Sequence, residues 1–346
     1  MKLRNLTLIV ALLIAASALV WFLDRPAANP ADRDPRVGRS LAGAETLADA
    51  ARVTITDDGR TVTLARAAGD DAGWIVANYH DLPADFTKLA TLTRALLDAK
   101  VDRFVTASPA KIERLGFGQT RIEFIDTNGT ALWAVDLGKT ADSGGRFLRF
   151  DGAPAAYLAR LNTWIDPVAK NWADSALVAL KPADVARVEI GLPDGSTVTA
   201  TRETVDADFT SPDAAEGETL KTAAVTSLLN TLTGLRFTDT AAPDAEEAVA
   251  AREHARTVKL TTFDDQTLTI ALGRRPAPPA PEKADDKDAD AANETPAPAA
   301  GPVFALVSSS ETNAAINVLM ERRAFQVGEF TFTGLPADRA ALFEAP

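Results

Sequence analysis

The sequence lacks cysteine altogether and contains only two histidines among its 346 residues. Without a thiol the chain forms no disulfide, carries no cysteine nucleophile and builds no zinc ribbon. His80 and His254 are far apart in the sequence, and neither has a second ligand at the spacing that zinc sites use. Residues 78–81 place His80 beside Asp81, but an unpartnered loop histidine is more often structural than a general base. We therefore predict no metal site.

Common catalytic motifs are missing as well. Neither a G-x-S-x-G nucleophile elbow nor a Walker loop occurs. Residues 115–118 (LGFG) contain two glycines but no third, and they precede a predicted strand, so they indicate the end of a helix. The acid pairs at 57–58 and 264–265 fall in predicted turns, whereas carboxylate catalysis needs opposed groups in a cleft. The sequence thus predicts no catalytic, cofactor-binding or metal-binding residue, no cofactor, and a protein that is not an enzyme.

An excess of positive charge is also absent, since the net charge is -12 at pH 7. Nucleic-acid-binding proteins usually carry a basic patch or stripe, so this charge argues against a nucleic-acid partner. Hydrophobic residues at 46% and charged residues at 24% are typical of a folded globular protein. At about 100–200 residues per domain, the chain is long enough for two domains.

What the sequence does contain near its start is an uncharged run of 18 residues, 6–23, preceded by Lys2 and Arg4. A helix of that length is about 27 Å long, close to the hydrocarbon thickness of a bilayer. Trp21 lies near its far end, where an indole can sit at the interface. A cleaved signal peptide is the alternative, with Ala-Ser-Ala at 16–18, but that site lies inside the apolar run. We predict an uncleaved transmembrane helix over residues 6–23, within an N-terminal membrane anchor of residues 1–23.

The charges around this run predict its orientation. Basic residues concentrate on the cytoplasmic side of a membrane, so Lys2 and Arg4 place the N-terminus in the cytoplasm. The bulk of the chain would then lie in the periplasm, as in a single-pass protein of the bacterial inner membrane. A cytoplasmic bulk stays open, because several arginines also follow the run.

A β-hairpin pattern occurs twice. Residues 51–66, ARVTITDDGRTVTLAR, alternate apolar and polar positions around an Asp-Gly turn. Residues 186–202, ARVEIGLPDGSTVTATR, repeat this pattern at an offset of about 135 residues. The elements that follow each hairpin also recur in order. They are two amphipathic helices (88–99 and 221–232), two strand pairs (120–139 and 256–275), two further strands (147–150 and 303–307) and two final helices (154–164 and 311–321).

This ordered recurrence predicts an α+β fold: a tandem duplication of a hairpin–helix–antiparallel meander–helix unit, preceded by the transmembrane helix. The expected divisions are an anchor (1–23), a flexible tether (24–46), a first copy (47–180) and a second copy (181–346). Residues 276–301, made almost wholly of Pro, Ala, Asp, Glu and Lys, predict a disordered insertion in the second copy. Trp74, Trp164 and Trp172 are expected to fill the core, an aromatic platform for a glycan or peptide being the alternative.

Four segments, read in order, resemble a bacterial family known as the domain of unknown function 4340. They are GWIVANYHDLPADFTKLATLTRALLDAKV (73–101), IERLGFGQTRIEFIDTNGTALWAVDLGK (112–139), GGRFLRFDGAPAAYLARLNTWI (144–165) and WADSALVALKPADVARVEI (172–190). The resemblance covers roughly residues 47–200. It implies a single-pass envelope protein, often encoded beside ABC-type export systems with auxiliary subunits similar to those of gliding-motility transporters. It implies no catalytic residue.

Anchor and resemblance together predict a non-enzymatic, membrane-anchored periplasmic accessory or scaffold protein of an ABC-type transport complex. Its partners would be permease or auxiliary subunits, bound by β-augmentation at exposed edge strands. The alternative is a periplasmic ligand-binding module that takes a glycan or a peptide in a cleft between the two copies. A third possibility, an envelope hydrolase, has no nucleophile–base pair in the sequence to support it.

Overall fold

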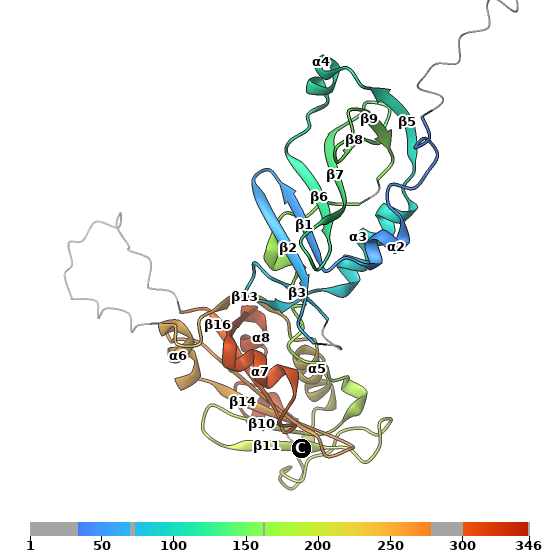
Figure 1. Cartoon of the computed structure of the whole chain (residues 1–346). Coiled ribbons are helices and arrows are strands. Elements are labelled where there is room, and N and C mark those ends of the chain that lie inside the picture. Colours follow the sequence, from blue (N-terminus) through green and yellow to red (C-terminus); the bar gives the residue numbers. More distant parts are fainter. Residues whose placement is uncertain (1–33, 70–72, 162, 278–299, 345–346) are drawn as a thin grey trace, which may run out of the picture. The chain divides into compact units, whose positions relative to one another are not determined.

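The computed structural model describes residues 34–69, 73–161, 163–277 and 300–344 (Figure 1). The chain divides into two compact units, unit 1 up to Asp174 and unit 2 from Ser175 onward. Each unit is built on one large sheet, of nine strands in unit 1 and seven in unit 2, and every strand pair in the described residues is antiparallel.

The sheet of unit 1 runs in the order β4-β3-β2-β1-β6-β7-β8-β9-β5. Its helices are short except for α3. The elements of unit 1 are α2 (Ala44–Ala48), β1 (Arg52–Asp57), β2 (Arg60–Arg66), β3 (Trp74–Val76), β4 (Leu82–Pro83), α3 (Phe86–Asp98), β5 (Val101–Thr106), α4 (Pro109–Ile112), η2 (Glu113–Leu115), β6 (Thr120–Ile125), β7 (Ala131–Thr140), β8 (Arg146–Phe150), β9 (Ala156–Ala159) and η3 (Ala169–Trp172).

The larger sheet of unit 2 runs in the order β11-β10-β14-β15-β16-β17-β13, and β12 pairs with β18 in a separate two-stranded sheet. The elements of unit 2 are η4 (Pro182–Asp184), β10 (Val185–Gly191), β11 (Thr197–Thr201), β12 (Thr219–Leu220), α5 (Thr222–Thr233), β13 (Phe237–Ala241), α6 (Glu246–Glu253), β14 (Arg256–Thr262), β15 (Thr267–Gly273), β16 (Val303–Ser309), α7 (Ala315–Arg322), β17 (Ala324–Val327), α8 (Glu329–Thr333), η5 (Arg339–Ala341) and β18 (Phe343–Glu344).

The two hairpins form as the sequence predicted. In β1 and β2 the residue pairs Val53–Leu64 and Ile55–Val62 face each other and are fully buried, because alternate side chains share one face of a strand. The turn places Asp58 and the following glycine at positive φ, a conformation that aspartate and glycine tolerate. β10 and β11 pair in the same way in unit 2. The helices predicted over 88–99 and 221–232 are α3 and α5, and their leucine faces are buried.

The predicted α+β fold class, however, is wrong. Large antiparallel sheets dominate both units, and no repeated hairpin–helix–meander–helix unit organises them. The helix predicted over 154–164 is instead a turn followed by strand β9, which pairs with both β8 and β5. Residues 155–159 are buried without interruption. A short apolar run of that kind fits a buried strand and a buried helix equally well, so periodicity could not separate the two.

Strand order is what the two units have in common. If β2-β1-β6-β7-β8-β9-β5 is laid over β11-β10-β14-β15-β16-β17-β13, seven of the nine strands of the unit 1 sheet have a counterpart in unit 2, and β3 and β4 have none in this sheet. The helices between these strands differ: α7 connects β16 to β17, whereas only the turn at residues 151–155 connects β8 to β9.

The predicted transmembrane helix over residues 6–23, and residues 24–33 of the tether, lie outside the described residues. Within the described part of the chain, no helix is long and apolar enough to cross a bilayer. The sequence-based assignment of a single-pass inner-membrane protein with a periplasmic bulk is therefore corrected: the structure does not support it. The predicted insertion at 276–301 also lies almost wholly outside the described residues.

Candidate functional site

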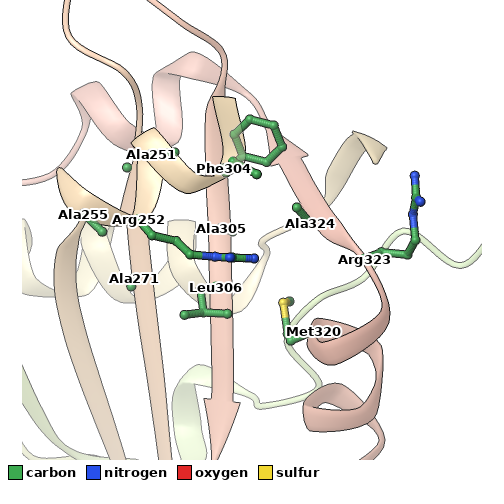
Figure 2. A pocket seen from close by; sticks show the side chains of 12 residues that line it. Ala251, Arg252, Ala255, Ala271, Phe304, Ala305, Leu306, Met320, Arg323 and Ala324 are labelled. Carbon is green, nitrogen blue, oxygen red and sulfur yellow. The ribbon is translucent and has the colours of Figure 1, made fainter. Parts of the chain in front are cut away.

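A pocket opens in unit 2 between α6 and α7, over strands β15 and β16 (Figure 2). Helix α6 contacts β15 and β16, and α7 contacts β16 and β17. The pocket has a volume of about 320 Å³ when its open mouth is included. It is lined by Ala248, Ala251, Arg252, Ala255, Ala271, Gly273, Phe304, Ala305, Leu306, Met320, Arg323 and Ala324.

The register of two strands builds its floor. Ala271 faces Leu306, and Gly273 faces Phe304, across the β15–β16 pair. Directly opposed residues share one face of a sheet, so these four lie together beneath the helices. A Cβ atom on Gly273 would overlap the carbonyl oxygen of Ala251 in α6. Glycine at this position therefore allows α6 to lie directly on β15.

Small side chains form the wall toward α6. Ala248 and Ala251 are buried and cluster with Phe304 and Ala324. From the other side α7 contributes Met320, which is also buried. Alanines project too little volume to fill the space between two helices and a sheet, and the pocket is what they leave open.

One charged side chain, that of Arg252, lies over the pocket. Figure 2 shows the Arg252 side chain reaching from α6 over the apolar floor, while the guanidinium of Arg323 points away. Arg323 donates hydrogen bonds to the Thr240 hydroxyl at 3.1 and 3.3 Å. The Arg252 side chain makes no hydrogen bond or ion pair with any residue that the structure describes. The site thus combines an apolar floor with one uncompensated cation.

Apolar surface is exposed on the pocket floor, where Leu306 is 40% exposed. No acid–base pair lines the pocket. Across the described ranges, no group of three or more His, Cys, Asp or Glu side chains could hold a metal ion. This arrangement is suited to binding an apolar group.

The equivalent position in unit 1 is charged. Asp136 faces Arg149 across β7 and β8, where unit 2 has Ala271 and Leu306, and Arg121 lies on the other side of Asp136. Asp136 accepts from Arg149 at 3.0 Å and from Arg121 at 3.1 Å. Arg121 also donates to Asp151 at 2.9 Å. Burial acts to lower the pKa of Arg121, but its bonds to these carboxylates outweigh burial and hold that pKa above its usual range.

In unit 1, too, a glycine allows a connecting segment to approach the sheet closely. A Cβ atom on Gly138 would overlap the Leu115 carbonyl oxygen and press on the Phe117 ring. Gly138 and Gly273 occupy matching positions at the ends of β7 and β15, each after a leucine. In both units a connecting segment therefore lies close against the sheet at a glycine.

A second polar cluster in unit 1 surrounds Asp166, which is only 8% exposed. Lys88 of α3 donates to Asp166 at 2.8 Å and lies 4.9 Å from the centre of the Trp172 ring. The Trp172 indole N–H donates to the Asp166 backbone carbonyl. Burial disfavours the ionised carboxylate, but hydrogen bonds from Lys88, the Val168 N–H and Asn171 outweigh it and lower the pKa of Asp166. Every polar group is satisfied by a structural neighbour, so the cluster anchors α3 to residues 166–172.

Comparison with models of protein families identifies the family of this chain. The model for the Domain of unknown function (DUF4340) matches residues 74–253, more than half of the chain. The chain belongs to the DUF4340 family. The match begins at β3 and ends at the last residue of α6, so it includes Gly138 and Arg252 but stops before β15, β16 and α7. It starts and ends later than the span of 47–200 expected from the sequence. No curated protein and no solved structure matches the chain.

The residues that the sequence analysis considered as possible site residues do not lie together in the structure. His80 lies in a turn at positive φ in unit 1, and His254 follows α6 in unit 2. Gly116 ends η2 in the left-handed conformation, as a helix stop predicts. Asp58 and Asp265 occupy turns at positive φ. None of these residues lines the pocket.

Trp74, Trp164 and Trp172 differ in how far their side chains are buried. Trp172 is buried, and Trp74 is half-buried beneath Arg66, whose guanidinium lies 5.3 Å from the ring centre. Trp164, in contrast, is 83% exposed, so the prediction that it fills the core is wrong. Residue 162, two positions before it, lies outside the described residues.

The edge strands are partly covered by other segments of their own unit. β4 is flanked by the bridge between Ala84 and Ala173, and β11 by the bridge between Thr201 and Thr210. Residues 38–41 form hydrogen bonds with residues 99–101 at the start of β5. Covered edges have fewer free N–H and C=O groups for an incoming strand.

Sequence reasoning missed the pocket. Its residues are alanines, a glycine, a methionine and single arginines, which match no motif of a binding site. One signal was present: the Leu-Gly pair at 137–138 recurs at 272–273. Those two glycines mark the places where a connecting segment lies on the sheet.

Proposed function

We propose that this DUF4340 protein acts by binding other proteins, as a non-enzymatic accessory or scaffold subunit of an ABC-type transport complex. The observation that carries the binding role is the pocket of unit 2, whose apolar floor, partly exposed at Leu306, and single cation supply recognition chemistry and no acid–base pair. The transport assignment rests on the family resemblance. Because the sheet edges are partly covered, the pocket is a better candidate for the contact than β-augmentation.

A pull-down tests this proposal. The full-length chain, tagged at its C-terminus, would be purified from its native cells in mild detergent, and co-purifying proteins identified by mass spectrometry. Permease or ATPase subunits of an ABC transporter, enriched over a tag-only control, are the expected result. Recovery of the bait alone in repeated preparations would contradict it.

A second candidate is a glycan- or peptide-binding module, favoured by the exposure of Trp164. Exposed indole rings stack on sugars and on apolar side chains. Titration with peptidoglycan fragments should then change tryptophan fluorescence in the wild type, and the change should be smaller in Trp164→Phe. An identical response of both proteins would count against this function.

A further inference from the structure

We propose that the pocket of unit 2 binds the C-terminal residue of a partner polypeptide, with an apolar side chain on the pocket floor and the terminal carboxylate on Arg252. This inference rests on the proposed protein-binding function and specifies the chemistry of the segment that is bound.

The floor selects the side chain. Ala271, Phe304, Leu306 and Met320 offer carbon and one thioether sulfur to an occupant. Leu306 is 40% exposed at the bottom of a hollow that two helices already shield from two sides. An aliphatic side chain seated there would remove this surface from water, and burial of apolar area is the main favourable term in association.

Arg252 selects the charge. Its guanidinium has no acidic partner among the described residues, and it extends over an apolar surface instead (Figure 2). A carboxylate matches the planar fork of a guanidinium and can accept two parallel hydrogen bonds. An ion pair beside an apolar wall is less screened than one in open water.

Unit 1 shows what is missing at this position of unit 2. There the arginines on the equivalent strip of sheet, Arg121 and Arg149, both pair with Asp136. In unit 2 the residue at the place of Asp136 is Ala271. At this strip, unit 2 therefore has no acidic residue and has the pocket instead, and helix α6 contributes Arg252. Arg252, which is exposed, is therefore free to bind a carboxylate from outside these residues.

The size of the pocket points to a chain end. The pocket is small, and its volume of about 320 Å³ includes open solvent at the mouth, so it can receive no more than a single side chain. A C-terminal residue presents a side chain and a carboxylate from the same Cα atom. An internal acidic residue would instead carry main chain in both directions over the helices α6 and α7 that border the pocket. The occupant that satisfies floor, charge and size together is a terminal Leu, Ile, Val or Met.

Methionine labelling gives a direct readout. The chain has only two methionines, Met1 and Met320, and Met320 lines the pocket. Full-length protein labelled with ¹³C at the methionine methyl groups would be titrated with N-acetyl-leucine, which imitates a chain end. N-acetyl-leucinamide removes the carboxylate, and N-acetyl-glycine removes the side chain.

N-acetyl-leucine should shift the Met320 methyl signal and saturate with a Kd in the range of about 1–10 mM, as expected for a ligand of a dozen heavy atoms. The amide should bind about five- to tenfold more weakly, since about 1.4 kcal/mol corresponds to tenfold. N-acetyl-glycine should leave the signal in place. A Met320 signal unmoved by N-acetyl-leucine, or equal binding of acid and amide, would overturn the proposal without any variant.

Variants assign the two contacts. Arg252→Gln should reduce binding of N-acetyl-leucine to the level of the amide and leave amide binding unchanged. Ala271→Leu should fill the hollow and abolish both. Arg187→Gln, an exposed arginine of the same unit outside the pocket, is the matched control and should change neither. Loss of acid binding in Arg187→Gln equal to that in Arg252→Gln would contradict the assignment.

The pull-down separates this inference from the proposed function. If N-acetyl-leucine binds as expected but no transporter subunit co-purifies, the pocket assignment stands and the transport role fails. If transporter subunits co-purify equally with the wild type and with Ala271→Leu, the transport role stands and the pocket is not its contact.

Discussion

Units 1 and 2 complete the same strip of sheet in opposite ways. Over β6, β7 and β8 of unit 1 the strip carries Arg121, Asp136 and Arg149, in which both arginines form ion pairs with the one aspartate. Over β14, β15 and β16 of unit 2, Ala271 and Leu306 occupy the central positions and two helices border them. The strand order beneath is the same.

This difference shows which kinds of residue a sheet can carry beneath a helix. Burying Asp136 and Arg149 under a helix would remove both charges from water, which is costly even for a paired ion. Alanine and leucine carry no such penalty. Unit 2 has α7 between β16 and β17, and unit 1 has a short turn at the matching place. An apolar strip and an added helix thus occur together, and a pocket arises where the two fit imperfectly.

The units can be observed separately. All five tryptophans and both tyrosines precede Ser175, so fluorescence reports on unit 1, while far-UV circular dichroism reports on both units.

The largest effect is expected for Gly273→Ala. The new Cβ would overlap the Ala251 carbonyl and lie 2.9 Å from the Cα of Ala255, and both neighbours are backbone. Helix α6 must therefore move off β15, at about 3 kcal/mol of unfolding free energy. Urea unfolding should show the loss by circular dichroism, with the tryptophan transition unchanged.

The matching change in unit 1, Gly138→Ala, should cost somewhat less, about 2 kcal/mol, because only the Leu115 carbonyl among the close neighbours is backbone, whereas the Phe117 ring can rotate away. This loss should appear in tryptophan fluorescence. Gly73→Ala, with no atom within 4 Å of the new Cβ, is the control. Equal stability of Gly73→Ala and Gly273→Ala would show that α6 does not depend on the glycine.

Asp166→Asn should destabilise unit 1 by about 2 kcal/mol at pH 7, because Lys88 and a buried site lose their carboxylate. The lowered pKa of Asp166 means that the folded state favours the ionised form. Its contribution is present above the unfolded pKa, near about 3.9, and is lost as the pH falls through the lower folded value.

The difference between wild type and Asp166→Asn should accordingly shrink below about pH 4, as measured by urea unfolding with tryptophan fluorescence. Asp98→Asn, at an exposed position of α3, is the control. A difference that stays constant from pH 7 to about pH 3 would be inconsistent with an ionised Asp166.

Asp136→Ala should cost unit 1 about 1 kcal/mol, since Arg149 loses its carboxylate while Arg121 keeps Glu123 and Asp151. In the double variant Asp136→Ala/Arg149→Leu, which copies unit 2, most of this loss should be recovered because no arginine is left unpaired. Fluorescence-detected urea unfolding measures both. A double variant less stable than the single one would show that the charges do more than neutralise each other.

The smallest effect is expected for Glu218→Gln in unit 2. The hydrogen bond from Arg339, at 2.6 Å, lowers the pKa of Glu218, but the pair is only partly buried, and ion pairs near the surface contribute little. The thermal transition by circular dichroism should shift by less than that of Asp136→Ala. A larger shift would show that this contact fastens the 213–218 loop to the C-terminal segment.

Local patterns predicted the parts of the fold that depend on local chemistry. The Asp-Gly turns, the alternating strands and the leucine faces of α3 and α5 follow from residue spacing, and all of them form. The turn-and-strand segment ending at β9 did not follow, because a run of five buried residues carries no period that separates strand from helix.

The pocket could not be predicted for a different reason. Its shape depends on which alanines of α6 face which residues of β15 and β16, a tertiary relation that only the β15–β16 register and Gly273 determine. Trp164 was assigned to the core because large rings are usually buried, and nothing local marks its exposure. The search for catalytic motifs could not find this site, because a site made of small apolar residues matches no such motif.

The covered edges described above also bear on how the protein behaves at high concentration. A free strand edge is a template onto which another molecule can add, and such addition leads to domain swapping or fibrils. Residues 38–41 bonded at the start of β5, and the bridges beside β4 and β11, interrupt those templates. Removing residues 34–43 would free the N–H and C=O groups at the start of β5, and we expect the shortened protein to associate with itself more readily. The stretch of chain before the first hairpin thus shortens the free edge of this sheet.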